Sequence, residues 1–353
     1  ECFTAEWIEQ VSSELHYNDK NLIEKVIRAL SLLEMLVKAG CPLVFKGGTA
    51  LMLILGKSAH RLSIDIDVIC PPGTNIEDYL KSFADFGFIN LELVERKQRD
   101  DADIPKSHSK FFYQIAYRND TDAQSYILLD VLYEDIHYFR TQQIAINCPF
   151  IRLEGKPLMV TVPSAEDILG DKLTAFAPNT TGIPYYKNGR SCSMEIAKQL
   201  YDVGRLFENV SDLQITKEAF RKIAVVELSY RSFGTDIGQV FNDIRQTALC
   251  ISTRGKAGEG DFDLIQDGII RVKSFMYKQR YLIDHAIIDA ARAAYLATLI
   301  EKGINEIESY SNNPADIKDM VIRPSLPNKL NKLRSNLPEA YYYWAKTSEL
   351  LEA

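Results

Sequence analysis

Two aspartates, Asp65 and Asp67, stand two residues apart in the run 62–69, in which apolar and polar side chains alternate. Such alternation predicts a β-strand, and side chains two residues apart on a strand project to the same face. Two carboxylates held this close repel each other and would raise a pKa unless a divalent cation lies between them. The pair therefore indicates an oxygen-ligated Mg²⁺ site, although a solvated strand face is the better explanation of the pair taken alone.

A glycine-rich turn comes before the acids. Gly47, Gly48 and Thr49 lie between a short apolar run, 41–45, and a predicted helix over 50–55. Glycines allow a close approach to the backbone, and the N–H groups at the start of a helix favour an anionic phosphate. A tight turn from strand to helix also needs glycine without any ligand. The turn therefore indicates a phosphate site only in combination with the acids.

A third acid, Asp130, interrupts the otherwise apolar run 126–133. Burying an unpaired charge costs roughly several kcal/mol, so Asp130 needs a partner, and a metal shared with Asp65 and Asp67 would supply one. Three acids on neighbouring strands beside a glycine turn are the parts needed for metal-assisted nucleotidyl transfer. In that chemistry one Mg²⁺ escorts the triphosphate and a second lowers the pKa of the attacking hydroxyl.

The elements that must position these residues divide the chain into two halves. The first half is predicted to contain helices over 21–38 and 76–86 and strands over 62–69, 91–94, 111–117 and 126–133. The second half is predicted to contain helices over 164–176, 194–207, 217–228, 237–250, 262–281, 285–309 and 340–350. These patterns predict an α+β (α/β) fold: a mixed-sheet catalytic domain over 1–160 and a mainly helical domain over 161–353.

Composition excludes several classes of protein. With 353 residues, 46% of them hydrophobic, the chain can bury one or two sizeable cores, and its net charge of −7 argues against a globally basic coat. The six cysteines form no C-x-x-C pair and the five histidines show no metal-ligand spacing. Neither a bilayer-spanning stretch nor a signal peptide is evident, so we expect a cytoplasmic protein without a membrane partner.

The chemistry-bearing residues resemble a known family. The run Lys-Gly-Gly-Thr-Ala-Leu at 46–51, followed by Arg-Leu-Ser-Ile-Asp-Ile-Asp at 61–67, is similar to the signature of the AbiEii/AbiGii toxin nucleotidyltransferases. That family is a branch of the DNA polymerase β-like nucleotidyltransferase superfamily, whose third carboxylate matches Asp130. The segment 171–175 resembles the lysine-bearing helix of the family. The resemblance covers roughly residues 20–210.

One segment departs from the family pattern. Residues 198–203 resemble the R-D-x-Y-D-L segment of the family, but Lys198 replaces the arginine and Gln199 replaces the first aspartate, while Asp202 is kept.

The resemblance implies a nucleotidyltransferase fold and an NTP-using toxin of a bacterial toxin–antitoxin or phage-defence system. Asp65, Asp67 and Asp130 would then be catalytic and would hold two Mg²⁺ ions, with Mn²⁺ as an alternative metal. The expected partners are an RNA or tRNA acceptor and a cognate antitoxin. The expected nucleotide-binding residues are Lys46, Gly47, Gly48, Thr49, Arg61, Ser63, Lys172 and Asp202.

Several supporting residues have plainer explanations. A surface salt bridge explains Arg61 as well as a phosphate contact does, and Lys172 could simply cover apolar surface. Asp202 could orient Lys172 or form a structural ion pair. In the tail, 321–346 carries five basic residues against one acid, interleaved with aromatic residues. This segment could contact RNA, but a helix that packs its aromatic side chains inward is the preferred interpretation.

Two other functions stay open from the sequence. A glycosyltransferase could use the D-x-D pair to bind a nucleotide-sugar diphosphate through Mn²⁺, but it requires neither the Gly-Gly-Thr turn nor the third acid. A catalytically silent nucleotide-binding or interaction module on the same scaffold is the second alternative, because of the departure at 198–199.

Overall fold

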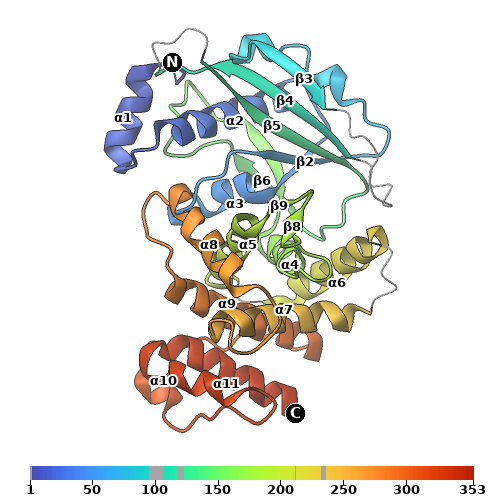
Figure 1. Ribbon diagram of the computed structural model, residues 1–353. Helices are drawn as coiled ribbons and strands as arrows, with labels where there is room; N and C mark the ends of the chain where they lie inside the picture. Colours follow the sequence, from blue (N-terminus) through green and yellow to red (C-terminus); the bar gives the residue numbers. More distant parts are fainter. Residues whose placement is uncertain (1, 95–105, 118–122, 211, 232–235) are drawn as a thin grey trace. The chain divides into compact units, whose positions relative to one another are not determined.

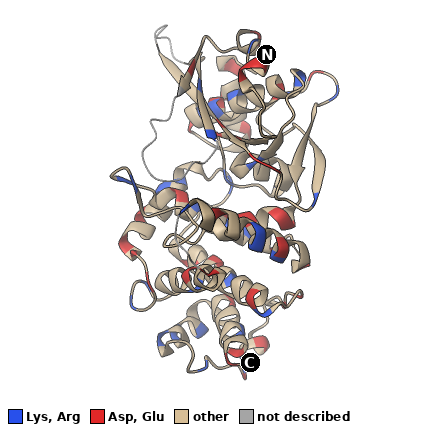
Figure 2. Cartoon of the chain, turned by 90° about the vertical axis from the view of Figure 1, so that its right-hand side faces the viewer, with Lys and Arg blue, Asp and Glu red and all other residues tan. Residues whose placement is uncertain are grey.

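The computed structural model describes residues 2–94, 106–117, 123–210, 212–231 and 236–353. The chain forms two compact units, the first made of Glu1–Ser164 with Ser274–Arg280 and the second of Ala165–Lys273 with Tyr281–Ala353. Among the described residues, no helix is both long and apolar enough to cross a membrane. Acidic and basic residues are interspersed along both units (Figure 2).

The first unit is built on a five-stranded sheet with strand order β1-β2-β5-β4-β3 (Figure 1). Its strands are β1 (Val44–Lys46), β2 (Ile66–Cys70), β3 (Asn90–Val94), β4 (Lys106–Gln114) and β5 (Gln124–Tyr133). Strands β2 and β5 run parallel, whereas every other neighbouring pair is antiparallel. The predicted mixed sheet is therefore confirmed.

The core of this unit lies on one face of the sheet. In β5, Ile127, Leu129 and Val131 are buried, while Leu128 and Asp130 are half-buried on the opposite face. Helix α2 (Lys20–Lys38) packs against β2 and β5 and closes the apolar face. The remaining elements of the unit are α1 (Ala5–Leu15), α3 (Gly47–Leu55), and the hairpin of β6 (Thr141–Ala145) and β7 (Met159–Pro163).

A short segment from late in the chain completes the first unit. The Leu62 N–H donates to the Phe275 carbonyl at 2.8 Å, and the Tyr277 N–H donates to the His60 carbonyl at 3.1 Å. The Tyr277 hydroxyl also donates to the Ala59 carbonyl. The helix predicted over 262–281 is therefore wrong beyond Val272, because the following residues pair with the segment that leads to the acids.

The second unit is helical, as predicted. It consists of α4 (Ala165–Ala175), the small hairpin β8–β9 (Tyr186–Lys187 and Arg190–Ser191), α5 (Ser193–Phe207), α6 (Leu213–Tyr230), α7 (Ile237–Ser252), α8 (Phe262–Val272), α9 (Ile283–Lys302), α10 (Leu333–Asn336) and α11 (Pro338–Glu352). Helix α9 is buried along most of its length and contacts α5, α7 and α11. Its many alanines allow these neighbours to pack closely.

Candidate functional site

A row of charged side chains crosses the sheet of the first unit. Lys46 of β1 is registered with Asp67 of β2, Asp67 with Asp130 of β5, and Asp130 with His108 of β4. Registered neighbours on adjacent strands project to the same face, and adjacent strands lie about 4.8 Å apart. The four side chains therefore form one line, which we call the charged row, with two carboxylates side by side at its centre.

The glycine turn lies directly against this row. Gly47 has a φ of +78°, and a Cβ placed on it would lie 2.1 Å from Oδ2 of Asp67. A Cβ on Gly48 would lie 2.7 Å from Oγ of Ser63 and 2.9 Å from Nη2 of Arg61. Only glycine permits both the positive φ and this close approach. The start of α3 is therefore brought against Arg61, Ser63 and Asp67 together.

Thr49 fixes the first acid rather than facing outward. Its side chain is fully buried, and its hydroxyl donates to the backbone carbonyl of Asp65 at 2.7 Å. Asp65 lies one residue before β2, so the predicted strand over 62–69 begins only at Ile66, and residues 62–65 are not part of a strand. What Thr49 can offer a phosphate is therefore its backbone N–H in the first turn of α3.

Arg61 is buried, so a purely surface salt bridge does not describe it. Its Nη1 donates to the Leu62 carbonyl at 3.0 Å, and its backbone bridges to Met276 of the late segment. The guanidinium is thereby held close to the Gly48 backbone. A guanidinium beside a glycine turn is well suited to bind phosphate oxygens.

Asp130 has a partner that the sequence analysis did not consider. Its Oδ1 is hydrogen-bonded to Nδ1 of His108, whose side chain is 20% exposed. The other ring nitrogen, Nε2, is buried and has no hydrogen-bond partner among the described residues. Residues 106–110 are all polar and therefore gave no local signal of a strand, so the strand was predicted to begin only at residue 111.

A second missed residue is Lys25 of α2. Burial lowers the pKa of its ammonium group, whereas the charges of Asp65 and Asp19 act in the opposite direction. The Lys25 Nζ also lies 5.5 Å from the ring centroid of Tyr126. Lys25 falls between Leu22 and the buried Ala29 at helical spacing. A lysine at that spacing on an otherwise apolar face was the signal that could have revealed it.

The donor set of the charged row fits a hard divalent cation by its chemistry. Carboxylate oxygens are the ligands that Mg²⁺ prefers, and Asp67 and Asp130 are neighbours in register. In the part of the chain that the structure describes, however, no three His, Cys, Asp or Glu side chains are gathered closely enough to hold a metal ion. Oδ1 of Asp130 faces His108 instead. The donors are thus in place, but a closed metal cage is not preformed.

The other two expected site residues lie in the second unit. The Lys172 Nζ lies 3.0 Å from Oδ2 of Asp202 and donates to Oε1 of Gln199, also at 3.0 Å. Lys172 and Asp202 are both buried. The departure at Gln199 therefore replaces a carboxylate with an amide oxygen that still accepts a hydrogen bond from the lysine.

The comparison with protein-family models identifies the family of this chain. The family model described as "Nucleotidyl transferase AbiEii toxin, Type IV TA system" matches residues 30–316. This match spans most of the chain, so the protein is a toxin-type nucleotidyltransferase. More specifically, it belongs to the AbiEii family. No curated protein sequence matches the chain.

Two solved structures are similar at low sequence identity. JHP933 from Helicobacter pylori is 16% identical with a TM-score of 0.38, over 81% of this chain and 92% of that one. MenT4, a nucleotidyltransferase toxin from Mycobacterium tuberculosis H37Rv, is 14% identical with a TM-score of 0.43, over 83% of this chain and 89% of that one.

Proposed function

We propose that this nucleotidyltransferase transfers an NMP group from an NTP to a hydroxyl of an RNA acceptor, in a Mg²⁺-dependent reaction, and that a cognate antitoxin restrains it. The observation that carries the proposal is the charged row beside the Gly47–Gly48 turn. The row supplies carboxylates for a metal, and the turn supplies backbone donors for phosphates. A D-x-D glycosyltransferase requires no such turn, so the family match and the geometry favour nucleotidyl transfer.

Asp65, Asp67 and Asp130 would hold the metal. Bound Mg²⁺ would neutralise the triphosphate and lower the pKa of the attacking hydroxyl. Asp67 lies on β2 and Asp65 immediately precedes that strand. Asp130 lies on β5, the parallel neighbour of β2. His108 would orient the Asp130 carboxylate through its Nδ1. Such outer partners typically fix the direction of a ligating side chain.

The phosphates would be bound by the glycine turn. The N–H groups of the first turn of α3, at Gly47, Gly48 and Thr49, would favour the β- and γ-phosphates. Arg61 is held against Gly48 and adds a cation there, while Ser63 adds a hydroxyl. Lys46, at the end of the charged row, adds a second cation.

The reaction would proceed as an in-line substitution. The oxygen of the acceptor hydroxyl forms a bond to the α-phosphorus while the bond from that phosphorus to the bridging oxygen breaks, and pyrophosphate leaves. The hydroxyl proton would pass to the Asp130 carboxylate. We assign Lys172 to triphosphate binding from the resemblance of its helix, with Asp202 and Gln199 fixing its ammonium group.

Incubation with each α-labelled NTP and total cellular RNA or protein tests the proposal. We expect label on RNA that depends on Mg²⁺. The double variant Asp65→Asn/Asp67→Asn should lower labelling by more than about a thousandfold, because a metal site supplies several kcal/mol of transition-state stabilisation. The matched control is Asp78→Asn/Asp85→Asn, two exposed acids of the same unit, which should label normally.

Three results would contradict the proposal. Labelling retained by the Asp65/Asp67 variant would remove the acids from catalysis. Label found on protein rather than RNA would refute the acceptor. Binding of NTP without any transfer would favour the catalytically silent module.

A further inference from the structure

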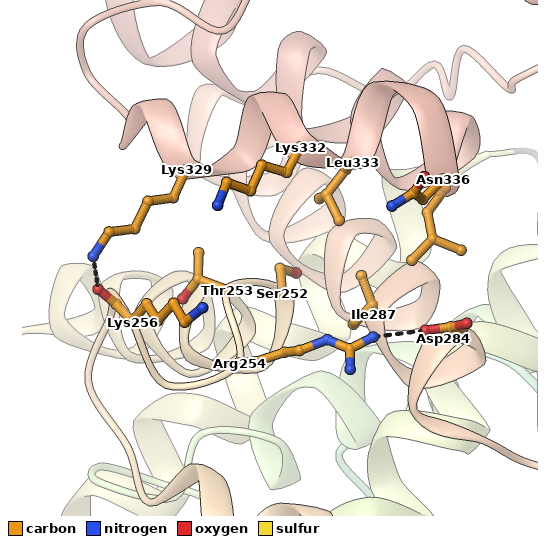
Figure 3. A pocket seen from close by; sticks show the side chains of 11 residues that line it. Ser252, Thr253, Arg254, Lys256, Asp284, Ile287, Lys329, Lys332, Leu333 and Asn336 are labelled. Carbon is orange, nitrogen blue, oxygen red and sulfur yellow. Dashed lines mark hydrogen bonds and ion pairs between the residues drawn. The ribbon is translucent and has the colours of Figure 1, made fainter.

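The second unit contains a basic cavity that the proposed reaction does not use. It has a volume of about 470 Å³ and opens between the loop that follows α7 and the short helical segment 328–336 (Figure 3). Four cations line it, Arg254 and Lys256 from the loop and Lys329 and Lys332 from the helical segment, against one acid, Asp284. In a chain with a net charge of −7, this is a local concentration of positive charge.

Two of these cations are engaged by the protein itself. Arg254 Nη2 lies 3.0 Å from Oδ1 of Asp284, and both side chains are more than half exposed. The Lys329 ammonium group donates to the Lys256 carbonyl and bridges the cavity at one end (Figure 3). This bond joins the loop to the helical segment, and among the described residues no acid forms an ion pair with Lys329.

The other two ammonium groups have no such partner. Within the described residues, the Lys256 and Lys332 side chains form no ion pair or hydrogen bond. Both are exposed, and they extend from opposite walls along the space between the loop and the helical segment (Figure 3). Like charges placed face to face across a cavity repel each other, so an anion between them would be stabilised.

The floor of the cavity is apolar. Ile287 of α9 and Leu333 at the start of α10 are both buried, and Leu337 lies beside them. The amide of Asn336 supplies a hydrogen-bonding group at the edge. A basic rim over an apolar floor matches a nucleotide, in which a charged phosphate is joined to a flat ring with apolar faces.

We infer that this cavity binds one nucleotide of a single-stranded RNA, with the phosphate between Lys256 and Lys332 and the base on the Ile287–Leu333 floor. The inference rests on the proposed function in that RNA is the acceptor. A duplex keeps its bases stacked inside and offers none to a cavity, whereas a single strand can turn a base outward. An acidic protein segment would satisfy the cations with carboxylates alone, whereas a nucleotide joins the phosphate and the planar ring in one unit, which fits both parts of the cavity.

Fluorescence anisotropy with a short labelled single-stranded RNA, measured on the full chain at several salt concentrations, tests the inference. For Lys256→Ala/Lys332→Ala we expect weaker binding and a slope of log K against log salt that is shallower by about 0.7, because the two lysines share one phosphate and each phosphate neutralised on a single strand contributes about 0.7. The matched control is Lys302→Ala/Lys318→Ala, two exposed lysines of the same unit outside the cavity. Equal affinity and slope in all three proteins would overturn the inference.

A second series separates this inference from the proposed function. The loss of RNA binding caused by Lys256→Ala/Lys332→Ala should be the same in wild type and in Asp65→Asn/Asp67→Asn, because the cavity does not involve those acids and distant sites contribute additively. If label is transferred to RNA but Lys256→Ala/Lys332→Ala binds RNA as tightly as wild type does, the cavity inference alone fails. If binding depends on the cavity but no label is transferred, the proposed function alone fails. Polyglutamate that binds in a cavity-dependent manner, where RNA does not, would overturn the inference in favour of an acidic protein partner.

Discussion

The charged row of the first unit and the group formed by Lys172, Gln199 and Asp202 in the second, which we call the Lys172 cluster, differ in how their charges are arranged. In the row, two carboxylates lie side by side on parallel strands, and Asp130 is 38% exposed. In the cluster, Lys172 and Asp202 form a buried ion pair, with the Gln199 amide as an additional acceptor. Two carboxylates on a partly exposed face are stabilised when they bind a cation from solution. In the buried pair, the two side chains already neutralise each other.

The difference also concerns what fixes each group in place. Register between strands and a glycine turn position the row, so its geometry is set by backbone hydrogen bonds. The cluster is positioned by side chains on two helices, α4 and α5, that pack against each other. We therefore expect backbone changes to break the row and side-chain changes to break the cluster.

The largest effect on stability should come from Lys172→Met. It removes the Lys172 cation from beside the buried Asp202 carboxylate, which should lower the free energy of unfolding by up to about 3–5 kcal/mol. Urea denaturation followed by circular dichroism measures the change. The double variant Lys172→Met/Asp202→Asn should recover a large part of the loss. Equal destabilisation in the single and double variants would show that the pair is not the source.

Gly47→Ala should disturb the geometry of the charged row by straining the backbone of the glycine turn. An alanine there carries the strain of a φ of +78° and places its Cβ against the Asp67 carboxylate. We expect a loss of about 1–3 kcal/mol in stability and a fall of about a hundredfold in transfer rate, since small displacements of reacting groups are costly. Gly73→Ala is the matched control, because its φ is +84° but nothing lies within 4 Å of its Cβ position. A transfer rate equally low in both variants would contradict the close approach to Asp67.

His108→Ala tests whether the histidine at the end of the charged row orients Asp130. If His108 orients Asp130, transfer should fall by about 10–100-fold and stability should change little, because the imidazole is partly exposed. The rate at saturating NTP and the apparent Mg²⁺ affinity are the measurements. Lys110→Ala, on the same strand and paired with the exposed Glu92, serves as the control. A rate that rises in His108→Ala would mean that the imidazole competes with catalysis instead of supporting it.

The smallest effect concerns how the free energy of unfolding changes with pH, through Asp289 of the second unit. Burial raises the pKa of Asp289 to about 6, against the opposing charges of Arg292 and Arg205. The folded state therefore binds this proton more tightly than the unfolded state does, and its contribution to stability is lost as pH rises from about 4 to about 6.

The test compares wild type with Asp289→Asn in urea denaturation across that range. The difference in unfolding free energy should change by at most about 1.4 kcal/mol per pH unit, in the direction of a relatively less stable wild type at higher pH. Parallel pH profiles of the two proteins would show that Asp289 does not titrate in this window.

Much of the fold could be predicted because its signals are local. The apolar run 126–133 and the glycines at 47–48 are properties of adjacent residues, and they correctly indicated a strand and a strand-to-helix turn. The helix predicted over 76–86 is wrong, since the structure has two short 3-10 turns, Ile76–Tyr79 and Phe83–Phe86. Leu80 and Phe88 are buried, so tertiary packing overrides the local helical spacing there.

The parts of the site that could not be predicted depend on distant residues. The pairing of Asp130 with His108 requires the register of β4 against β5, which no local pattern reveals. The start of β4 was missed because residues 106–110 contain none of the apolar side chains that mark a strand in a sequence. In the same way, nothing in the spacing of 274–280 shows that it pairs with 59–62.

That late segment has a consequence for the order in which the protein matures during translation. The residues that carry the three acids leave the ribosome long before Ser274–Arg280 has been synthesised. Until then, Arg61 and Leu62 lack the backbone partners supplied by Phe275 and Met276. A nascent or prematurely terminated chain therefore carries an unfinished first unit, and under the proposed function a cell would be exposed to the full activity of this toxin only after most of the polypeptide has been made.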